Sequence, residues 1–201
     1  MLTQLGLFVT MMPPESLATA DLSRFRTIVV GPRAFAATPA LAAQSARLQA
    51  FANAGGTVVV QYGQQEMQVP GILPYPLTIA RPAERVTDEN APVRVLDPSS
   101  PLLAFPNRIE PADFKNWVQE RSTYMPTTAD PHWQRLLEMH DPGEPPNENA
   151  LLVAPVGKGA YVYVTLALFR QLPAGIPGPA RLFLNLLSAD GRSAASSPPR
   201  P

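Results

Sequence analysis

Two short runs dominated by apolar, mostly β-branched residues stand in the first third of the chain, at Thr27–Gly31 and Thr57–Tyr62. Largely apolar runs of this length are typical of strands that are covered on both faces, as in a parallel sheet. Between them, Thr38-Pro39 suits a helix start, apolar positions within Leu41–Ala52 recur at helical spacing, and Gly55-Gly56 suits a helix end. This order predicts a βαβ unit with parallel strands.

The last third of the chain predicts a hairpin followed by a helix. Apolar runs at Leu151–Pro155 and Ala160–Thr165 flank Gly157-Lys158-Gly159. Two apolar runs around a glycine-containing turn indicate antiparallel strands, whereas the pattern of a phosphate-binding loop is missing. Helical spacing of leucines over Gly178–Ser188 predicts a helix that closes the fold.

The middle of the chain, where proline and turn residues dominate, supports only short elements. We expect strands at Leu7–Met12, Leu77–Ala80 and Val93–Leu96, helical turns at Asp21–Phe25 and Pro111–Trp117, and a helix over His132–Met139. In that last helix, Trp133, Leu136 and Leu137 are expected to face inward. The prediction is one α/β domain over residues 1–188 and a disordered tail over 189–201.

Composition narrows the function classes. The 201 residues include 25 prolines, and the hydrophobic share of 45% indicates a folded chain with much proline-fixed loop. The zero net charge gives no reason to expect nucleic acid as a partner. The absence of cysteine excludes thiol nucleophiles and thiolate metal sites, and with only two histidines we expect no metal or other cofactor. The sequence predicts neither a transmembrane segment nor a signal peptide, which favours the cytoplasm. A periplasmic location, or one at the periphery of a membrane complex, stays open.

Catalytic patterns are weak. No serine or cysteine follows the run Thr57–Tyr62, where an α/β hydrolase carries its nucleophile. His140 stands beside Asp141 and Glu144, which permits a residual hydrolase. The intervening Asp-Pro-Gly is turn chemistry, and we favour a turn.

Five residues are candidates for binding a ligand at the C-terminal edge of the predicted sheet: Arg33, Tyr62, Glu120, Arg121 and Arg170. Ligands bind at this edge in open α/β sheets, and Arg170 follows a predicted buried strand. Glu120 and Arg121 belong to the segment Trp117–Arg121, which suits either a sugar or peptide site or a buried network that pins an irregular loop. We favour the network.

Several longer segments carry a family resemblance. They are GPRAF (31–35), AGGTVVVQYG (54–63), PYPLTIARP (74–82), ERVTDENAPV (84–93), DFKNWVQERSTYMP (113–126), HDPGEPP (140–146) and GKGAYVYVTLALFRQLPAGIPGPARLFLNLLS (157–188). Together they resemble the class I glutamine amidotransferase-like domain at the C-terminus of PIG-L/LmbE-type deacetylase fusion proteins. The resemblance implies a flavodoxin-like three-layer α/β/α sandwich with a mostly parallel sheet.

Two departures from that family concern function. Active members carry a cysteine where this chain has Tyr62-Gly63, and a His-Pro-Glu motif where it has Phe169-Arg170-Gln171. Glutamine hydrolysis is therefore not expected. In addition, Met1–Gly6 resembles the end of the family's first helix, which implies that the first strand is missing.

The leading hypothesis from the sequence is a non-catalytic structural module that docks on a larger protein assembly, with a membrane complex as one setting. Proline-fixed loops at 64–82, 97–111 and 170–179 are the expected docking surface, because rigid loops lose little entropy on binding. The alternatives are a carbohydrate or small-ligand binding domain built on the five candidate residues, and the residual hydrolase.

Overall fold

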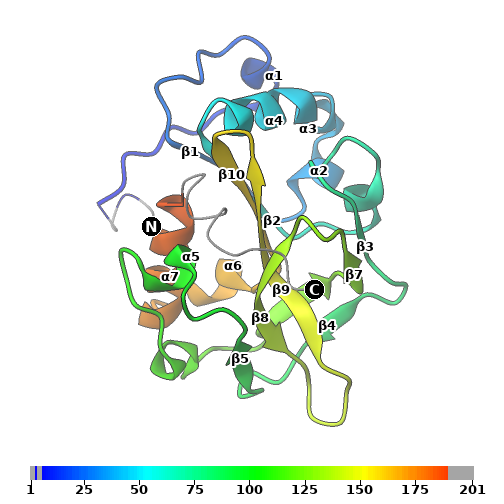
Figure 1. The fold of residues 1–201 in the computed structure, drawn as a ribbon, viewed down its shortest axis with the longest axis vertical. Coiled ribbons are helices and arrows are strands. Elements are labelled where there is room, and N and C mark those ends of the chain that lie inside the picture. Colours follow the sequence, from blue (N-terminus) through cyan, green and yellow to red (C-terminus); the bar gives the residue numbers. More distant parts are fainter. Residues whose placement is uncertain (1–2, 4–5, 190–201) are drawn as a thin grey trace.

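A computed structural model describes residue 3 and residues 6–189 (Figure 1). The predicted tail, apart from Ala189, and most of Met1–Gly6 lie outside these residues. A six-stranded sheet forms the centre of the fold, in the order β1-β2-β10-β9-β8-β5. Its strands are β1 (Thr27–Val30), β2 (Thr57–Gln61), β5 (Val93–Val95), β8 (Gln134–Met139), β9 (Asn147–Val156) and β10 (Gly159–Val164).

Two small antiparallel sheets lie beside it. They are formed by β3 (Leu77–Thr78) with β7 (Thr128–Ala129) and by β4 (Glu84–Val86) with β6 (Ser122–Met125). The helices are α1 (Pro14–Leu17), α2 (Ala34–Ala37), α3 (Pro39–Ala42), α4 (Ser45–Asn53), α5 (Pro101–Ala104), α6 (Leu168–Gln171) and α7 (Pro177–Leu187), with 3₁₀ turns η2 (Gln65–Gln68) and η3 (Pro111–Phe114).

The main sheet is mixed, and this corrects the expected fold. Strand β2 pairs parallel with β1 and with β10, but β9 pairs antiparallel with both β10 and β8, and β8 pairs antiparallel with β5. The prediction of a flavodoxin-like sandwich with a mostly parallel sheet is therefore wrong. The physical reason is the connections: β8, β9 and β10 follow one another through short turns, and such turns can join only antiparallel neighbours.

The predicted βαβ unit is confirmed. Thr27 pairs with Thr57 and Val30 with Val60 in parallel register, and α3 and α4 connect the two strands. The expected single helix is divided into these two short helices. The expected strands at Leu77–Ala80 and Val93–Leu96 are confirmed in shorter form as β3 and β5.

The predicted hairpin is confirmed as β9 and β10, in which Val156 pairs with Gly159. Gly157 has φ 57°, in the left-handed region that a tight hairpin turn requires. The helix expected near the C-terminus is confirmed as α7, and η3 lies within the expected helical turns.

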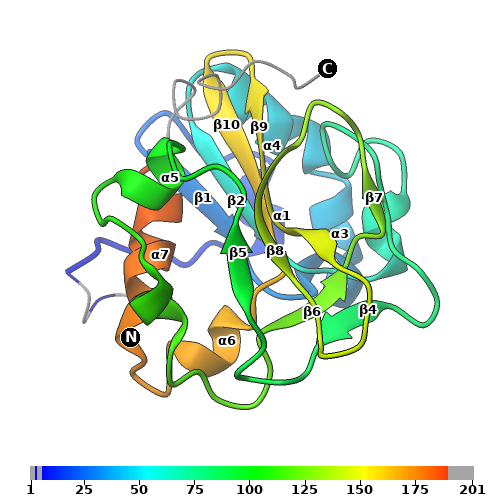
Figure 2. The same ribbon diagram turned by 60° about the horizontal axis from the view of Figure 1, so that its bottom comes forward.

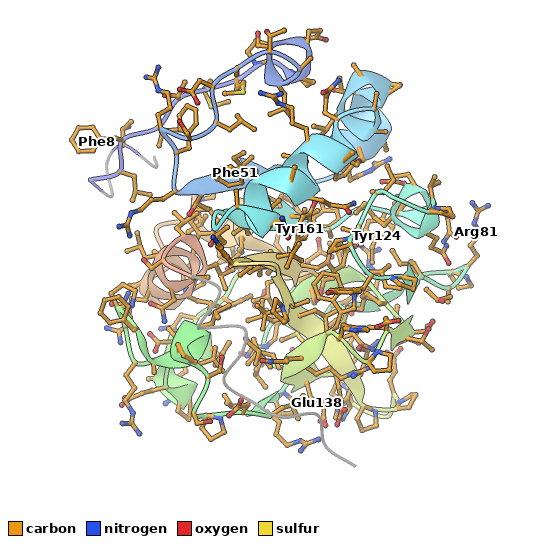
Figure 3. The ribbon with its side chains drawn as sticks, turned by 45° about the horizontal axis from the view of Figure 1, so that its top comes forward. Phe8, Phe51, Arg81, Tyr124, Glu138 and Tyr161 are labelled. Atoms are coloured by element: carbon orange, nitrogen blue, oxygen red, sulfur yellow. The ribbon has the colours of Figure 1, made fainter. Side chains whose placement is uncertain are left out.

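Two expected elements are wrong. The segment His132–Met139 is not a helix, because Gln134–Met139 forms β8 in the middle of the antiparallel part of the sheet. The segment Leu7–Met12 forms no strand, and its Phe8 side chain is fully exposed, so pairing there would bury little apolar surface. Figure 3 shows Phe8 projecting from the body of the molecule.

Apolar side chains fill both faces of the main sheet, and helices cover each face (Figures 1 and 2). On the face toward α4, Leu48 packs with Val58, Tyr161 and Tyr163. The opposite face packs Val59, Val162 and Val164 against α7. Because strand residues alternate between faces, consecutive residues of β2 and β10 enter different cores.

Candidate functional site

The three loops that follow the parallel strands meet at one edge of the main sheet. Arg33 follows β1, Tyr62 follows β2, and Phe169 and Arg170 follow β10. Since parallel strands end on the same side, this is the edge at which open α/β sheets bind ligands. The backbone N–H of Arg33 donates a hydrogen bond to the carbonyl of Tyr62 at 2.8 Å, which joins the first two loops.

Tyr62 lies at the centre of an aromatic group. Its ring stacks on Tyr124 of β6, with centroids 5.6 Å apart and planes 19° apart. It also contacts Phe169 at 5.6 Å, with the rings tilted by 53°. Tyr62 is buried and Phe169 is 36% exposed, so the aromatic group is buried at Tyr62 and open to solvent at Phe169. Figure 3 labels Tyr124.

A buried carboxylate links two arginines beside these rings. Glu120 accepts hydrogen bonds from Arg170 Nε at 2.9 Å and from an Arg85 terminal nitrogen at 3.0 Å. The Glu120 side chain is 10% exposed, whereas that of Arg85 is 52% exposed. The Arg170 guanidinium also lies over the Phe169 ring, 4.9 Å from its centroid. One carboxylate therefore orients two cations and leaves both partly open to solvent.

Gln171 holds the loop that carries Glu120. Its side-chain amide accepts from the Val118 N–H at 2.9 Å and donates to the Val118 carbonyl at 2.8 Å. The same amide nitrogen donates to the Glu120 carbonyl at 3.2 Å. Gln171 is fully buried and adjacent to Arg170. The end of α6 therefore fixes both the loop that carries Glu120 and the arginine that pairs with Glu120.

Non-glycine residues with left-handed backbone are concentrated around this edge. Arg33 has φ 55°, Gln119 has φ 65° and Tyr124 has φ 54°. A non-glycine residue in this region costs conformational energy, and such residues gather at functional sites. The strain lies in each of the three segments that surround Tyr62.

The charges around Tyr62 favour a neutral phenol and the binding of an anionic ligand. Burial raises the pKa of Tyr62, Glu120 and Tyr124 raise it further, and Arg33 and Arg170 oppose the rise. Arg33 is exposed and makes no ion pair within residues 6–189. The edge thus presents the guanidinium groups of Arg33, Arg85 and Arg170 beside Glu120, and the Glu66 carboxylate in the loop after Tyr62 accepts a hydrogen bond from the Gln64 N–H at 2.8 Å.

No family model matches this sequence, and no curated protein matches it either. One solved structure, described as "Cytoplasmic Protein STM3548 from Salmonella typhimurium", is similar in fold. It is 13% identical, with a TM-score of 0.61 over 94% of this chain and 84% of that one. The likeness shows a shared fold. Within the described part of the chain, no helix has the length and apolar character needed to cross a bilayer.

Arg121 lies apart from the other four candidate residues. Its guanidinium donates to the Phe114 carbonyl at 2.8 Å and stacks over the Trp117 ring at 5.5 Å. Burial lowers the pKa of Arg121, with Asp88 and Glu89 opposing the change. Trp117 itself donates to the Asp113 carbonyl. These contacts form the buried loop-pinning network that the sequence favours for this segment.

The His140 segment forms a turn. The Asp141 carboxylate accepts hydrogen bonds from the backbone and hydroxyl of Thr87 and from the backbone of Asp88. His140 lies 4.0 Å from Glu138 instead. Since Asp141 is occupied in joining two loops, the geometry favours its structural role. In the described ranges, no three histidine or acidic residues form a group that could hold a metal ion.

Sequence reasoning missed Tyr124 and Phe169 as neighbours of Tyr62, and Arg85 as a partner of Glu120. Arg85 and Tyr124 lie on the paired strands β4 and β6, which are too short to be recognised by hydrophobic alternation. Phe169 directly precedes the candidate Arg170. Its position after a buried strand was the available signal.

Proposed function

We propose that this chain binds a small anionic ligand at the C-terminal edge of its parallel strands, without catalysing a reaction on it. The observation that carries the proposal is the arrangement around Tyr62, where Glu120 orients Arg85 and Arg170 while Arg33 keeps a free guanidinium. Guanidinium groups recognise carboxylates and phosphates through paired hydrogen bonds.

Two features support an anion over a neutral sugar. Both carboxylates near Tyr62 are already engaged, because Glu120 is buried and accepts from two arginines and Glu66 accepts from the Gln64 N–H, whereas Arg33 remains available as a donor. The Tyr62 phenol, whose pKa is raised, supplies one more donor near neutral pH. Carbohydrates that carry a carboxylate or phosphate remain within the proposed ligand class.

The test is a calorimetric titration of the protein with inorganic phosphate, citrate and glucose 6-phosphate. Glucose serves as the neutral probe. We expect saturable binding of at least one anion and none of glucose. Arg33→Ala should weaken that binding about tenfold, as expected for one lost charge-assisted hydrogen bond. Arg26→Ala, an exposed arginine before β1 at the opposite edge, is the matched control. Binding of no anion, or equal loss in both variants, contradicts the proposal.

A second candidate, docking on a larger protein assembly, has one observation in its favour. Val69 and Phe105 are 53% and 67% exposed, and each lies in a proline loop expected to dock. Val69→Ser with Phe105→Ser should abolish co-purification of a specific protein from cell extract, with unchanged unfolding free energy. A partner retained by this double variant would contradict docking through these loops. A cytoplasmic location belongs to the same proposal, and fractionation of soluble and membrane material tests it.

A further inference from the structure

A pocket of about 470 Å³ lies away from the Tyr62 site, beside the turn that joins β8 and β9. This volume falls within the range of small-molecule sites. Glu84 of β4, Thr127 and Thr128 near β7, Arg135 of β8 and residues 145–149 line it. The pairing of β8 with β9 shifts register twice, between Arg135 and Leu137 and between Leu137 and Met139. Such irregularities redirect side chains and are frequent beside binding sites.

Two buried asparagines line the pocket, and hydrogen bonds within the protein fix their side chains. Asn147 and Asn149 both donate to the Pro126 carbonyl, at 2.9 and 3.0 Å. The side-chain Oδ1 of Asn147 accepts from the Asn149 backbone N–H at 2.8 Å. With their amides bonded in this way, the asparagines fix the shape of the site and orient the charged groups around it.

Those charged groups have opposite sign. Asn147 Nδ2 donates to one carboxylate oxygen of Glu84 at 2.5 Å. Arg135 donates through Nε to Asn149 at 3.1 Å and through one terminal nitrogen to the Ala129 carbonyl at 2.9 Å. Within residues 6–189, the second terminal nitrogen of Arg135 and the second oxygen of Glu84 make no hydrogen bond to the protein. Both side chains are thus oriented by these asparagines and keep one charged atom for a ligand.

From this pairing we propose that the pocket binds a small zwitterion, namely a free amino acid or a dipeptide. The carboxylate of the ligand would pair with Arg135 and its ammonium group with Glu84, while Glu148 at the rim is already paired with Arg94 at 3.4 Å. No aromatic residue lines the pocket, so it lacks the ring surface on which sugars commonly stack. A simple anion is disfavoured by the Glu84 carboxylate, which faces no arginine partner within residues 6–189.

This site is independent of the one around Tyr62. Glu84 and Arg85 are consecutive on β4, but their side chains contact different partners. Glu84 contacts Asn147, and Arg85 contacts Glu120. Each site can therefore be removed without deleting a charged group of the other.

The test is an NMR titration of the full chain that follows the side-chain amides of Asn147 and Asn149. The probes are the L-amino acids and alanyl-alanine, each added up to a concentration of about 50 mM so that weak binding can be detected. Acetate, ethylamine and glucose serve as single-function probes. We expect saturable shifts with at least one zwitterion and weaker or no saturation with the single-function probes. Glu84→Gln, which keeps an acceptor for Asn147, should weaken binding roughly tenfold.

Two further variants keep the result interpretable. Thr128→Tyr places a bulky ring at the exposed rim, on a strand that favours it, and should block binding while the protein stays folded. Glu15→Gln, an exposed glutamate of α1, should change nothing. Absence of saturable shifts with every zwitterion, saturation by glucose or acetate alone, or undiminished binding in Glu84→Gln and Thr128→Tyr would overturn the proposal.

Discussion

The side chain of Gln171 pairs with the backbone of Val118 through two hydrogen bonds, as one peptide unit pairs with another in a sheet. Gln171→Leu would leave the half-buried N–H and carbonyl of Val118, and the buried carbonyl of Glu120, without this partner. We expect the free energy of unfolding to fall by roughly 2–4 kcal/mol, measured by urea denaturation. Gln49→Leu, which removes one hydrogen bond to the Gly71 carbonyl nearer the surface, should cost much less. Equal losses would show that Gln171 has no special role in holding the loop.

Two buried tyrosines of β10 form a matched pair with opposite expectations. Within the described residues, the Tyr161 hydroxyl has no hydrogen-bond partner, whereas that of Tyr163 accepts from the Gly63 N–H at 3.3 Å. Tyr161→Phe should therefore raise the unfolding free energy by about 1 kcal/mol, because it removes an unsatisfied buried group. Tyr163→Phe should lower it by about 1 kcal/mol. A stability loss of equal size in both variants would contradict the assigned hydrogen bonding.

Alkaline pH should destabilise the fold through its buried phenols. Burial raises the pKa of Tyr62, Tyr161 and Tyr163 above the ordinary value of 10.0. In the unfolded chain these groups lose their protons near pH 10, so the free energy of unfolding falls as the pH rises above that value. The urea midpoint should fall from pH 9 to pH 10.5. The fall should be smaller in the Tyr161→Phe variant, and an identical slope in both proteins would refute this origin.

Asp141 should stabilise the protein at neutral pH and lose this effect at acidic pH. Burial acts to raise the pKa of Asp141, but hydrogen bonds from Thr87 and Asp88 outweigh it, and the net pKa is lowered from 3.8. Its contribution to stability is present above the unfolded value and is lost as the pH falls through the lower folded value. Asp141→Asn should therefore destabilise the protein more at pH 7 than at pH 2.5. Glu144→Gln, in the same turn but exposed, serves as control, and a pH-independent effect of Asp141→Asn would count against the prediction.

Close packing between α7 and η3 should make Gly178 intolerant of a side chain. A Cβ atom there would lie closer than 3.0 Å to the backbone of Asp113. Gly178→Ala should cost about 2 kcal/mol or more, because backbone on both sides must move. Gly31→Ala, where a Cβ meets nothing within 4 Å, should be nearly neutral. Thermal unfolding of both variants checks this, and a neutral Gly178→Ala would show that η3 is loosely placed.

Local patterns predicted the parts of the fold that local chemistry decides. The apolar runs of β2, β9 and β10 can be recognised because these strands are mostly buried on both faces, that of β1 because it is short and β-branched, and the turn at Gly157 because its backbone is left-handed. Strand β8 was misassigned because Trp133, Leu136 and Leu137 also fit helical spacing. All three are buried, and the register shifts of β8 allow the adjacent Leu136 and Leu137 to be buried together.

The candidate site was predictable only in part. Arg33, Tyr62 and Arg170 could be found because each follows a recognisable strand, and parallel strands bring such positions together. Arg85 and Tyr124 reach the site through a two-stranded sheet whose partners are distant in sequence, which no local pattern encodes. The placement of Arg121 depends on Trp117 and Phe114 packing around it.

The parallel pairing of β2 with β10 also bears on how the chain reaches its fold. On one side of this seam, β1, α4 and β2 lie close together in sequence, and on the other side β8, β9 and β10 follow one another directly. Thr57 meets Ala160 only after about 100 intervening residues are brought together, which is the most entropically costly closure in the main sheet. Each half can therefore form early from local contacts, and the joining of the seam is the step expected to set the folding rate.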